Sequence, residues 1–179
     1  MTVLVEAISV VVRTDAIHAR YPGSWPAFRD DVPNSTLASD KQIARVGFMV
    51  PDDVKGFIDR LQARGLVFLR DGHAQDIAVA DQQRGITTRC DWLKFGHVTI
   101  GDNRVAACQM VGSQSQQVFT PDKWRFDGSL SQTFTFVPEG NLNKSMTPVS
   151  RDEGMDIYSN RLTGRLAYVG RVKDEEAGR

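Results

Sequence analysis

The segment Ile43–Leu69, IARVGFMVPDDVKGFIDRLQARGLVFL, decides the fold, because its residue pattern predicts a strand, a helix and a second strand in succession. Val46, Phe48 and Val50 recur at every second position, which is typical of a short, buried strand. Pro51 follows directly. Proline is tolerated at the first position of a helix because its missing N–H would have no partner there. The pattern therefore predicts that a helix begins at Pro51.

The helix that follows Pro51 has clear signals at both ends. Asp52 and Asp53 fall in its first turn, where the exposed N–H groups and the helix dipole favour negative charge. Gly65 stands where a left-handed residue is needed to leave the helix. A second apolar run, Leu66–Leu69, predicts the next strand. The helix is apolar on one face, at spacings of three and four residues, and that face carries Val54, Phe57, Ile58 and Leu61.

The composition predicts an ordinary globular protein. The chain has 179 residues, of which 41% are hydrophobic and 25% are charged, so it can bury a core and fits one domain with extensions. Its 22 basic and 22 acidic residues cancel, and its isoelectric point is about 6.8. A protein that binds duplex DNA or RNA needs a basic surface to neutralise the phosphates. We therefore expect no nucleic-acid partner.

The N-terminal stretch, MTVLVEAISVVV, is apolar but does not match a secretory signal. It lacks a basic segment, it includes Glu6, and no small-residue cleavage site follows it. No other stretch of the chain approaches the ~20 apolar residues that span a bilayer. We expect a soluble, cytoplasmic protein without a membrane partner. Val3–Val12 is expected to form one central strand that is buried on both faces.

Two further helices and a short strand complete the predicted core. Thr14 is expected to cap one short helix and Ser24 a second, since Ser and Thr favour the N-cap position. Thr36–Ala38 is expected to form a brief edge strand. The order of elements is then β-α-β-β-α-β, the ferredoxin-like arrangement in which two helices cover one face of an antiparallel sheet. We predict an α+β fold with this core.

A C-terminal run of antiparallel strands is predicted to extend the core. Ile77–Ala80 is one such strand. Trp92–Ile100 and Arg104–Val111 flank the sequence GDN at positions 101–103, a tight-turn sequence that is typical of a hairpin. Leu130–Phe136 alternates apolar and polar residues, as a half-buried strand does.

The composition changes along the chain, and the predicted domain organisation follows these changes. Residues 1–137 are predicted to form a single α+β domain. Residues 138–172 are predicted to form a loop-rich extension, because residues 138–160 are rich in Asn, Ser, Pro and Gly, with a final strand at Arg165–Val172. Residues 173–179 form a charged tail that we expect to be flexible.

The motifs of common catalytic and cofactor sites are absent from the sequence. His18, His73 and His97 have no second ligand at the spacing of a zinc motif such as HExxH or CxxC. The chain also lacks the glycine-rich phosphate loops GxxxxGK[ST] and GxGxxG and the serine hydrolase motif GxSxG. We therefore predict no metal site, no cofactor and no catalytic residue from motifs.

The two cysteines, Cys90 and Cys108, are expected to be reduced. If the hairpin turns about residue 102, Cys108 faces Gly96, and Cys90 lies six residues further along that strand, about 20 Å away. A disulfide requires Cα atoms within about 7 Å. A nucleophilic Cys90 would need a base, and His97, the nearest candidate in sequence, is seven positions away and would point to the opposite face.

The stretch Arg45–Phe68, RVGFMVPDDVKGFIDRLQARGLVF, resembles the strand–helix–strand half-module of the vicinal oxygen chelate family, which includes the glyoxalases. In that family a His or Glu near the start of such a strand commonly binds a metal. Here the corresponding place holds Ala44 and Arg45, and the first strand offers Ala7 with Glu6 beside it. The resemblance therefore implies a similar topology without the family's metal ligands.

One polar segment, Asp81–Trp92, DQQRGITTRCDW, is the strongest candidate for a binding site. Arginine supplies a planar fork of donors and tryptophan an anchoring surface, and binding residues are often found on loops between rigid elements. The alternative is a solvated connection whose tryptophan fills the core. The candidate ligand- or partner-binding residues are Asp81, Gln83, Arg84, Arg89, Cys90, Asp91, Trp92 and His97.

Two classes of function stay open at this point. The first is a soluble, non-enzymatic interaction protein, such as an immunity or antitoxin-like partner or an adaptor, because catalytic motifs are absent and the net charge is zero. The second is a small-molecule-binding or enzymatic α+β domain that is glyoxalase-like in topology and uses residues 81–92. The partner is accordingly a protein or a small polar ligand, and a homodimer is compatible with either. We favour the interaction protein.

Overall fold

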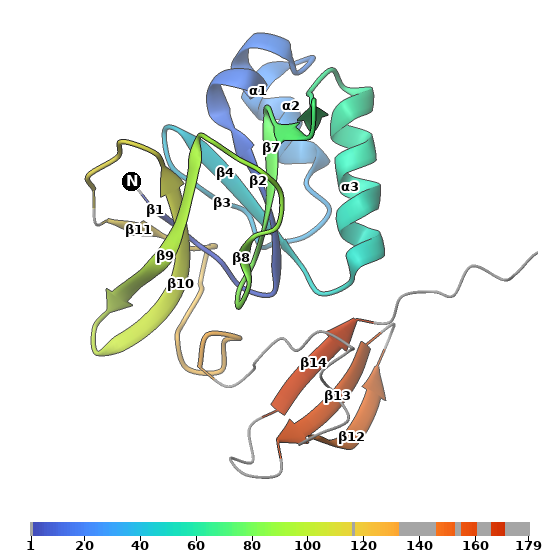
Figure 1. Ribbon diagram of the computed structural model, residues 1–179, viewed down its shortest axis with the longest axis vertical. Coiled ribbons are helices and arrows are strands. Elements are labelled where there is room, and N and C mark those ends of the chain that lie inside the picture. Colours follow the sequence, from blue (N-terminus) through green and yellow to red (C-terminus); the bar gives the residue numbers. More distant parts are fainter. Residues whose placement is uncertain (1, 116, 133–145, 153–154, 161–165, 171–179) are drawn as a thin grey trace, which may run out of the picture.

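The computed structural model describes residues 2–115, 117–132, 146–152, 155–160 and 166–170 (Figure 1). These residues form an α+β protein with three helices and several antiparallel sheets, so the predicted class is confirmed. No helix in the described ranges is both long enough and apolar enough to cross a membrane.

A five-stranded sheet lies at the centre of the molecule. Its strand order is β3-β4-β2-β7-β8, and every neighbouring pair is antiparallel. The strands are β3 (Ala38–Ser39), β4 (Ile43–Phe48), β2 (Ile8–Arg13), β7 (Ile77–Asp81) and β8 (Gly85–Ile86). Successive side chains of a strand point to opposite faces, so each face of this sheet has its own core.

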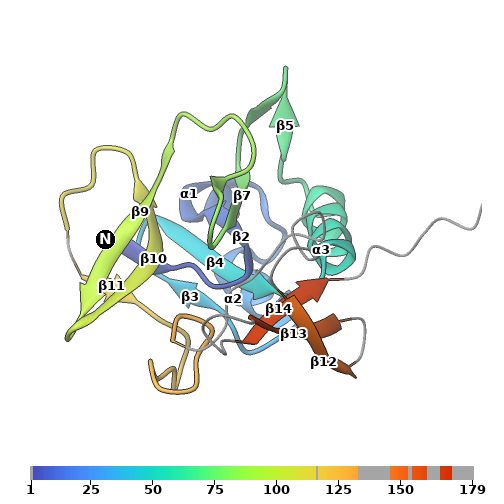
Figure 2. The same ribbon diagram turned by 60° about the horizontal axis from the view of Figure 1, so that its bottom comes forward.

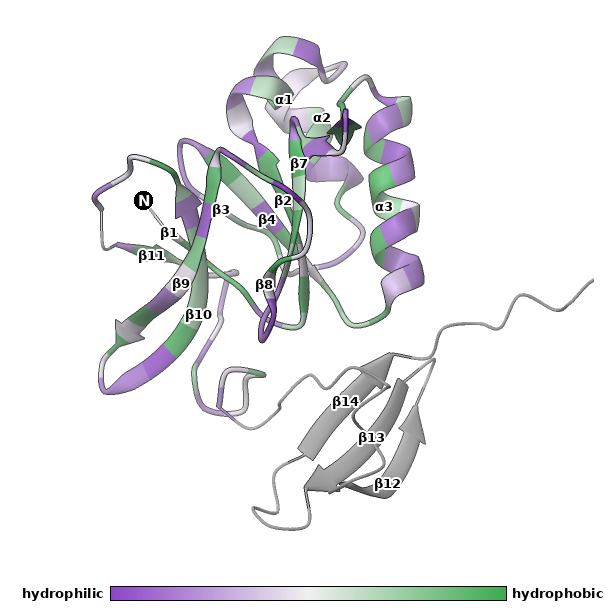
Figure 3. Ribbon diagram, in the orientation of Figure 1, coloured by the Kyte–Doolittle hydropathy of each residue, from purple (hydrophilic) through white to green (hydrophobic). Residues whose placement is uncertain are grey.

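Three helices cover one face of this sheet: α1 (Thr14–Arg20), α2 (Ser24–Asp31) and α3 (Pro51–Ala63). The green stripe of α3 in Figure 3 is its buried apolar face, which turns toward the strands. The sheet contributes every second residue to this core. The buried residues include Val10, Val12, Ala44, Val46, Ile77 and Val79 from strands and Ile17, Phe28, Val54, Phe57, Ile58 and Leu61 from helices.

A second, four-stranded sheet packs on the opposite face. Its order is β11-β1-β10-β9, with β11 (Val118–Phe119), β1 (Thr2–Leu4), β10 (Asn103–Met110) and β9 (Leu93–Ile100). Only the pair β1–β11 is parallel. Figures 1 and 2 show the β9–β10 hairpin and α3 on opposite sides of β2 and β4. The core between the sheets includes Val3, Val5, Val11, Ile43, Ala78, Ala80, Leu93, Ala106 and Cys108.

The predicted limits of the long helix are confirmed. Pro51 is the first residue of α3, and Asp52 and Asp53 lie in its first turn. Gly65, just beyond the helix, has φ of 96°, the left-handed conformation that its position requires. The four apolar residues of the predicted face are all buried.

The strand predicted at Leu66–Leu69 is wrong. Only Leu69–Arg70 (β5) is a strand, and it pairs with β6 (His73–Ala74) in a separate two-stranded ribbon. Leu66 is buried in the helix-side core, while the N–H of Val67 donates to the carboxylate of Asp76 at 2.7 Å. The carbonyls of Val67 and Phe68 accept the backbone N–H groups of Asp76 and Gln75, both at 2.9 Å, so this segment pairs with the residues before β7 and not with the five-stranded sheet. Its predicted place in the sheet is taken by β7.

Val3–Val12 is not one strand. The chain leaves the four-stranded sheet after Leu4 and enters the five-stranded sheet at Ile8. Ala7 has φ of 49°, which an extended strand cannot include. Its N–H donates to the side-chain carbonyl of Gln82 at 2.9 Å, a contact that stabilises the bend. Both halves are buried, as predicted, but in two different sheets.

Neither predicted helix cap is present. The N-cap of α1 is Arg13, and the Thr14 hydroxyl donates instead to the carbonyl of Lys41 at 2.8 Å. The N-cap of α2 is Gly23, with φ of 78°, and Ser24 is the first helical residue. The predicted edge strand at Thr36–Ala38 is found one to two residues later, as β3.

The predicted hairpin of β9 and β10 is confirmed, but its register differs by one residue. Cys108 pairs with Phe95, and Gly96 pairs with Ala107. The turn is therefore the two-residue sequence Gly101-Asp102. Of the strand predicted at Leu130–Phe136, the described residues up to 132 are in turns, and the rest lies outside the described ranges.

The C-terminal region contains more regular structure than the predicted loops. It forms an antiparallel sheet in the order β12-β13-β14, with β12 (Met146–Asp152), β13 (Met155–Asn160) and β14 (Leu166–Gly170). The loop predicted over residues 138–160 is therefore wrong where β12 and β13 lie, whereas the final strand is confirmed within residues 165–172. The predicted tail, 173–179, lies outside the described residues.

Candidate functional site

The predicted segment Asp81–Trp92 divides into two separate ends. At its start, Asp81 is buried, and its Oδ1 accepts the N–H groups of Gln83 at 2.8 Å and Arg84 at 2.9 Å. These bonds close the turn between β7 and β8. The Asp81 carboxylate therefore stabilises its own hairpin, while the side chains of Gln83 and Arg84 are exposed.

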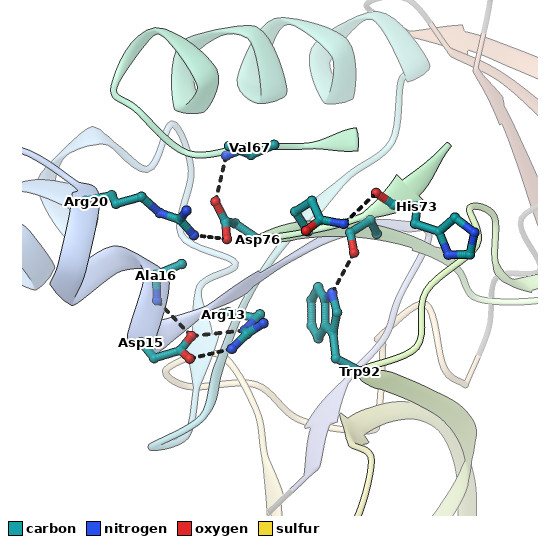
Figure 4. Close-up of polar contacts among 10 residues, drawn as sticks. Arg13, Asp15, Ala16, Arg20, Val67, His73, Asp76 and Trp92 are labelled. Atoms are coloured by element: carbon teal, nitrogen blue, oxygen red, sulfur yellow. Dashed lines mark hydrogen bonds and ion pairs between the residues drawn. The ribbon is translucent and has the colours of Figure 1, made fainter. Parts of the chain in front are cut away.

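The other end of the segment, Arg89–Trp92, packs against β6. The N–H of Ala74 donates to the carbonyl of Arg89 at 2.8 Å, and the indole N–H of Trp92 donates to the carbonyl of Ala74 at 3.1 Å (Figure 4). His73 lies 3.5 Å from the exposed Asp91 carboxylate. Trp92 thus anchors the chain before β9, as the structural alternative for this residue predicted.

The two ends lie at opposite ends of β7. Ala74 and Asp76 precede this strand and Asp81 ends it, so at the rise of an extended chain the five steps from Asp76 to Asp81 cover about 17 Å. Asp81, Arg84, Arg89 and Asp91 therefore do not surround one ligand. The predicted single site is not formed by these residues.

The charges around Trp92 are paired with one another. Arg13 lies over the Trp92 ring, 6.0 Å from its centroid, and makes two hydrogen bonds to Asp15, at 3.0 and 2.5 Å (Figure 4). These bonds lower the pKa of Asp15 and raise that of Arg13. Arg20 forms an ion pair with the buried Asp76. The arrangement stabilises the junction of β2, α1 and β7, with each of these carboxylates matched by an arginine.

Both cysteines are free thiols. Burial raises the pKa of the half-buried Cys90 and raises that of the fully buried Cys108 to about 12. A cysteine nucleophile needs the opposite shift, toward a thiolate at neutral pH. Neither environment therefore favours nucleophilic chemistry.

A buried arginine between the two sheets was not predicted as a functional or structural centre. Arg45 is 2% exposed, and its guanidinium donates to the hydroxyl of Ser9 at 2.8 Å and to the carbonyls of Glu6 at 2.9 Å and Thr36 at 3.2 Å. Burial lowers the pKa of Arg45 to about 10, so the group keeps its charge at neutral pH. The signal in the sequence was a lone charge within the apolar run of β4.

The carboxylate of Glu6 connects this buried region to a distant segment. Its Oε1 accepts the indole N–H of Trp124 at 3.2 Å, the backbone N–H of Ser131 at 2.9 Å and the hydroxyl of Ser131 at 2.6 Å. Gln82 adds a bond from its amide nitrogen to the carbonyl of Leu130 at 3.3 Å. Glu6 and Gln82 thus hold residues 124–131 against the bend between β1 and β2.

A groove of about 520 Å3 opens on the four-stranded sheet, and we call it the β9 groove. It is lined by three strands and the loop after β10. The residues that define it are Thr2, Lys94, Gly96, His97, Ala107, Gln109 and Ser115. Its volume falls in the range of known ligand sites. Of the candidate residues from the sequence, only His97 lines it.

The register of the hairpin explains why the groove is hollow. Gly96 pairs with Ala107, and Lys94 pairs with Gln109, so these four residues share one face of the sheet. The alternate residues Phe95 and Cys108 pack into the core between the sheets, which places the four on the outer face. A Cβ atom built on Gly96 meets no heavy atom within 4 Å. The two smallest residues of β9 and β10 thus lie side by side and leave space above them.

The rim of the groove is polar. Thr2 donates from its hydroxyl to the side chain of Gln109 and to the carbonyl of Ser115, both at 3.2 Å, which ties the loop after β10 to the sheet. Lys94 is exposed at the other end of the rim. Partial burial and then the charge of Arg104 lower the pKa of His97, whose ring lies beside that of Phe95 on the other face of β9. The groove thus combines amide and hydroxyl groups with one cation.

Neither a metal site nor a known relative identifies the function. Within the described residues, no three or more His, Cys, Asp and Glu side chains are grouped so that they can hold a metal ion. Comparison with protein-family models, curated proteins and solved structures finds no match to this chain. The geometry of the β9 groove is therefore the basis for a functional proposal.

Proposed function

We propose that the protein is a non-catalytic binding protein that holds its partner or ligand in the β9 groove. The observation that carries this proposal is the pairing of Gly96 with Ala107, which leaves about 520 Å3 of space beneath a polar rim. Side chains on both sides of the space can donate and accept hydrogen bonds. Ligand sites commonly combine such a preformed hollow with a few polar groups.

The chemistry of the groove supports binding rather than catalysis. The imidazole of His97 lies on the other face of β9, beside the Phe95 ring, at 5.7 Å between centroids. The thiol of Cys108 packs into the core between the sheets, and burial raises its pKa to about 12. The described contacts place the side chains of Thr2 and Gln109 within hydrogen-bond reach in this groove, and a hydroxyl and an amide do not form an acid–base couple. An adaptor or an immunity-type inhibitor would use a groove of this kind.

We also propose that the helix-covered sheet is a ferredoxin-like core. The order β7-β2-β4-β3, with antiparallel neighbours, supports this assignment. Each crossover passes through helices, α1 and α2 after β2 and α3 after β4. Both crossovers lie on the same face, as two split βαβ units require. The second sheet then adds to this core the surface that carries the groove.

The substitution Gly96→Val tests the proposed function. Valine favours a strand, and its Cβ has open space, so we expect the fold to be retained while the side chain fills the groove. The probes are a set of small polar molecules, screened by thermal shift, and a display library of random peptides. Every ligand found with the wild-type protein should bind Gly96→Val at least about 10-fold more weakly, as steric exclusion from a site requires.

Gly56→Ala is the matched control for this experiment. It also adds a Cβ atom in open space, but on α3, away from the β9 groove. Binding should therefore be unchanged in Gly56→Ala. Ligands that bind Gly96→Val and the wild-type protein equally, or the absence of any ligand in both screens, would contradict the proposed function.

A further inference from the structure

Strand β9 is an edge strand whose outer edge has no hydrogen-bonded partner among the described residues, although Gly85 of β8 packs beside the Phe95 ring. It pairs with β10 along its whole length and stands last in the order of its sheet. The N–H of Val111 donates to the carbonyl of Trp92, which identifies the pairs that exchange hydrogen bonds. Because such pairs alternate, Lys94, Gly96 and Val98 direct their backbone groups to β10. The backbone groups of the residues between them point away from the sheet.

The outward-pointing backbone groups belong to Phe95, His97 and Thr99. An independent bond supports this assignment, since the carbonyl of Ala106 accepts the N–H of Val5 and therefore points to β1 rather than to β9. No described strand or loop pairs with the outer edge of β9. His97 and Thr99 are also exposed. This is the arrangement to which an added strand can bind through main-chain hydrogen bonds.

The groove and the unpaired edge belong to the same strand. Gly96 lines the β9 groove, and its neighbours Phe95 and His97 carry the outward backbone groups. A strand added along this edge would place alternate side chains beside the groove face and beside the opposite face. Backbone pairing would then supply affinity, and the groove would select one side chain.

The charges beside the outer edge of β9 indicate which kind of peptide side chain would bind there. Lys94 is exposed on the groove face, and Arg104 is exposed on the opposite face, where its partner in the register is Thr99. Neither cation forms an ion pair with a described residue. Strand β9 itself contains no acidic residue. Both faces of this edge are therefore complementary to a segment that carries carboxylates.

We infer that the partner is an extended, acidic peptide segment that adds a strand to the outer edge of β9 and places a side chain in the β9 groove. This inference rests on the proposed function and specifies its partner. An edge lysine often serves only to prevent aggregation. A test must therefore separate peptide recognition from protection of the edge.

The first arm of the test uses the random-peptide display library. We expect the peptides enriched on the wild-type protein to be rich in Asp and Glu and free of proline at their centre. On Lys94→Glu, the same selection should lose these peptides. Enrichment without acidic residues, or the same acidic peptides on Lys94→Glu, would overturn the inference. So would failure to enrich any peptide.

The second arm removes one backbone donor from the edge. Thr99→Pro lacks the outward N–H but leaves the hydrogen bonds of β9 to β10 in place, and proline is tolerated at such edge positions. Binding of an enriched peptide should weaken about 3- to 10-fold, the value of one hydrogen bond. Thr99→Val is the matched control, because it keeps the N–H and loses only the hydroxyl. It should bind as the wild-type protein does.

N-methylated peptides give a measurement that does not depend on the folding of Thr99→Pro. One set of alternate amides should face β9, so methylating that set should abolish binding and methylating the other set should not. If neither set matters but Gly96→Val still blocks binding, strand addition is wrong and the proposed function stands. If Gly96→Val has no effect either, both fail. A dimer of the wild-type protein that Thr99→Pro dissociates would show that a second copy occupies the edge, which also overturns the inference.

Discussion

The two faces of the five-stranded sheet are both buried, but the residues that bury them differ in kind. On the helix side the buried set is almost wholly apolar, from Val10 and Val46 of the strands to Phe57 of α3. On the side of the second sheet, Arg45 and Ser9 occupy strand positions between apolar neighbours, with Glu6 beside them. The first face is buried by the packing of apolar side chains, and the second by packing around a hydrogen-bonded charge.

The apolar face can be predicted from the spacing of residues along the chain, and the polar face cannot. Apolar residues at helical and alternating positions identify one face of an element without reference to its partner. A buried arginine stabilises a structure only if its donors meet acceptors, and here the acceptors are 36 and 39 residues away for Ser9 and Glu6. The contacts of Arg45 depend on the bend at Ala7, which no periodic pattern marks.

Phe57→Ala should produce the largest effect and tests the apolar face. Phe57 is 1% exposed, and its ring lies 5.3 Å from that of Phe48. Removing a buried phenylalanine side chain leaves a cavity and costs about 3–5 kcal/mol of unfolding free energy. Urea denaturation would measure the loss. Lys55→Ala, on the exposed face of α3, should change the stability by less than about 0.5 kcal/mol. A loss below about 1 kcal/mol for Phe57→Ala would contradict this account of the helix-side core.

The helix that contains Phe57, α3, shows which features of the fold can be predicted from the sequence alone. Its first residue, its acidic first turn, its buried face and its left-handed exit at Gly65 are all local features, and all were predicted correctly. The strand predicted after it was wrong, because Val67 and Phe68 bond instead to Asp76 and Gln75, seven to nine residues further along the chain. The end signals of α3 were predictable, whereas the caps of α1 and α2 and the pairing of the segment after α3 were not.

Gly47→Ala should have the next largest effect, and it tests the polar face. Its Cβ would lie 2.5 Å from a guanidinium nitrogen of Arg45, which is closer than atoms approach without a shift. Arg45 is buried and holds three hydrogen bonds, so it cannot move freely. Overpacking of this kind costs about 1–3 kcal/mol. Gly56→Ala, which adds a Cβ in open space on α3, should instead gain up to about 1 kcal/mol.

The double variant Arg45→Met/Gly47→Ala checks the cause. If the clash with the guanidinium produces the loss, removing that group should make the cost of Gly47→Ala small, and the two substitutions should couple by more than about 0.5 kcal/mol. Strict additivity would show that Gly47 is needed for another reason. The measurement is again the unfolding free energy of all four proteins of the cycle.

The candidate site was less predictable than the fold. The polar residues of Asp81–Trp92 close a turn at one end and attach to Ala74 at the other. In a sequence, polar residues with these structural roles cannot be distinguished from polar residues that bind a ligand. The β9 groove depends on Gly96 lying beside Ala107, and the predicted register placed Cys108 there. A shift of one residue moves a side chain to the other face of a sheet. A pair of small residues on adjacent strands was the available signal.

Glu6→Gln should have a smaller effect on the same polar region. The amide keeps an acceptor for Trp124 and Ser131 but removes the charge that opposes Arg45 and strengthens the three bonds. The difference between charged and neutral hydrogen bonds predicts a loss of about 1–2 kcal/mol. Limited proteolysis should cut residues 118–132 faster. Asp127→Asn, an exposed substitution in the same segment, should leave both measurements unchanged, and equal behaviour of the two variants would contradict the role of Glu6.

Alkaline pH should produce the smallest effect and separates the two faces by their titrating groups. Cys108 lies between the sheets, and burial raises its pKa from 9.0 to about 12, whereas Tyr21 lies under the helices, and its pKa is raised from 10.0 to about 12. Above the ordinary pKa of each group the unfolded chain loses a proton that the folded chain keeps. The free energy of unfolding is therefore constant below the ordinary pKa of each group. Above that pKa it falls, by at most about 1.4 kcal/mol per pH unit for each group.

Between pH 9 and 10 the thiols titrate in the unfolded chain before tyrosine does. The urea midpoint of the wild-type protein should fall across this interval, by about 1 kcal/mol in unfolding free energy from Cys108. Cys108→Ala should remove most of this fall, and Cys90→Ala less of it, because Cys90 is only half-buried. Tyr21→Phe should leave the interval unchanged and reduce the fall only above pH 10. A pH dependence that Cys108→Ala does not alter would place the titrating group outside the layer between the sheets.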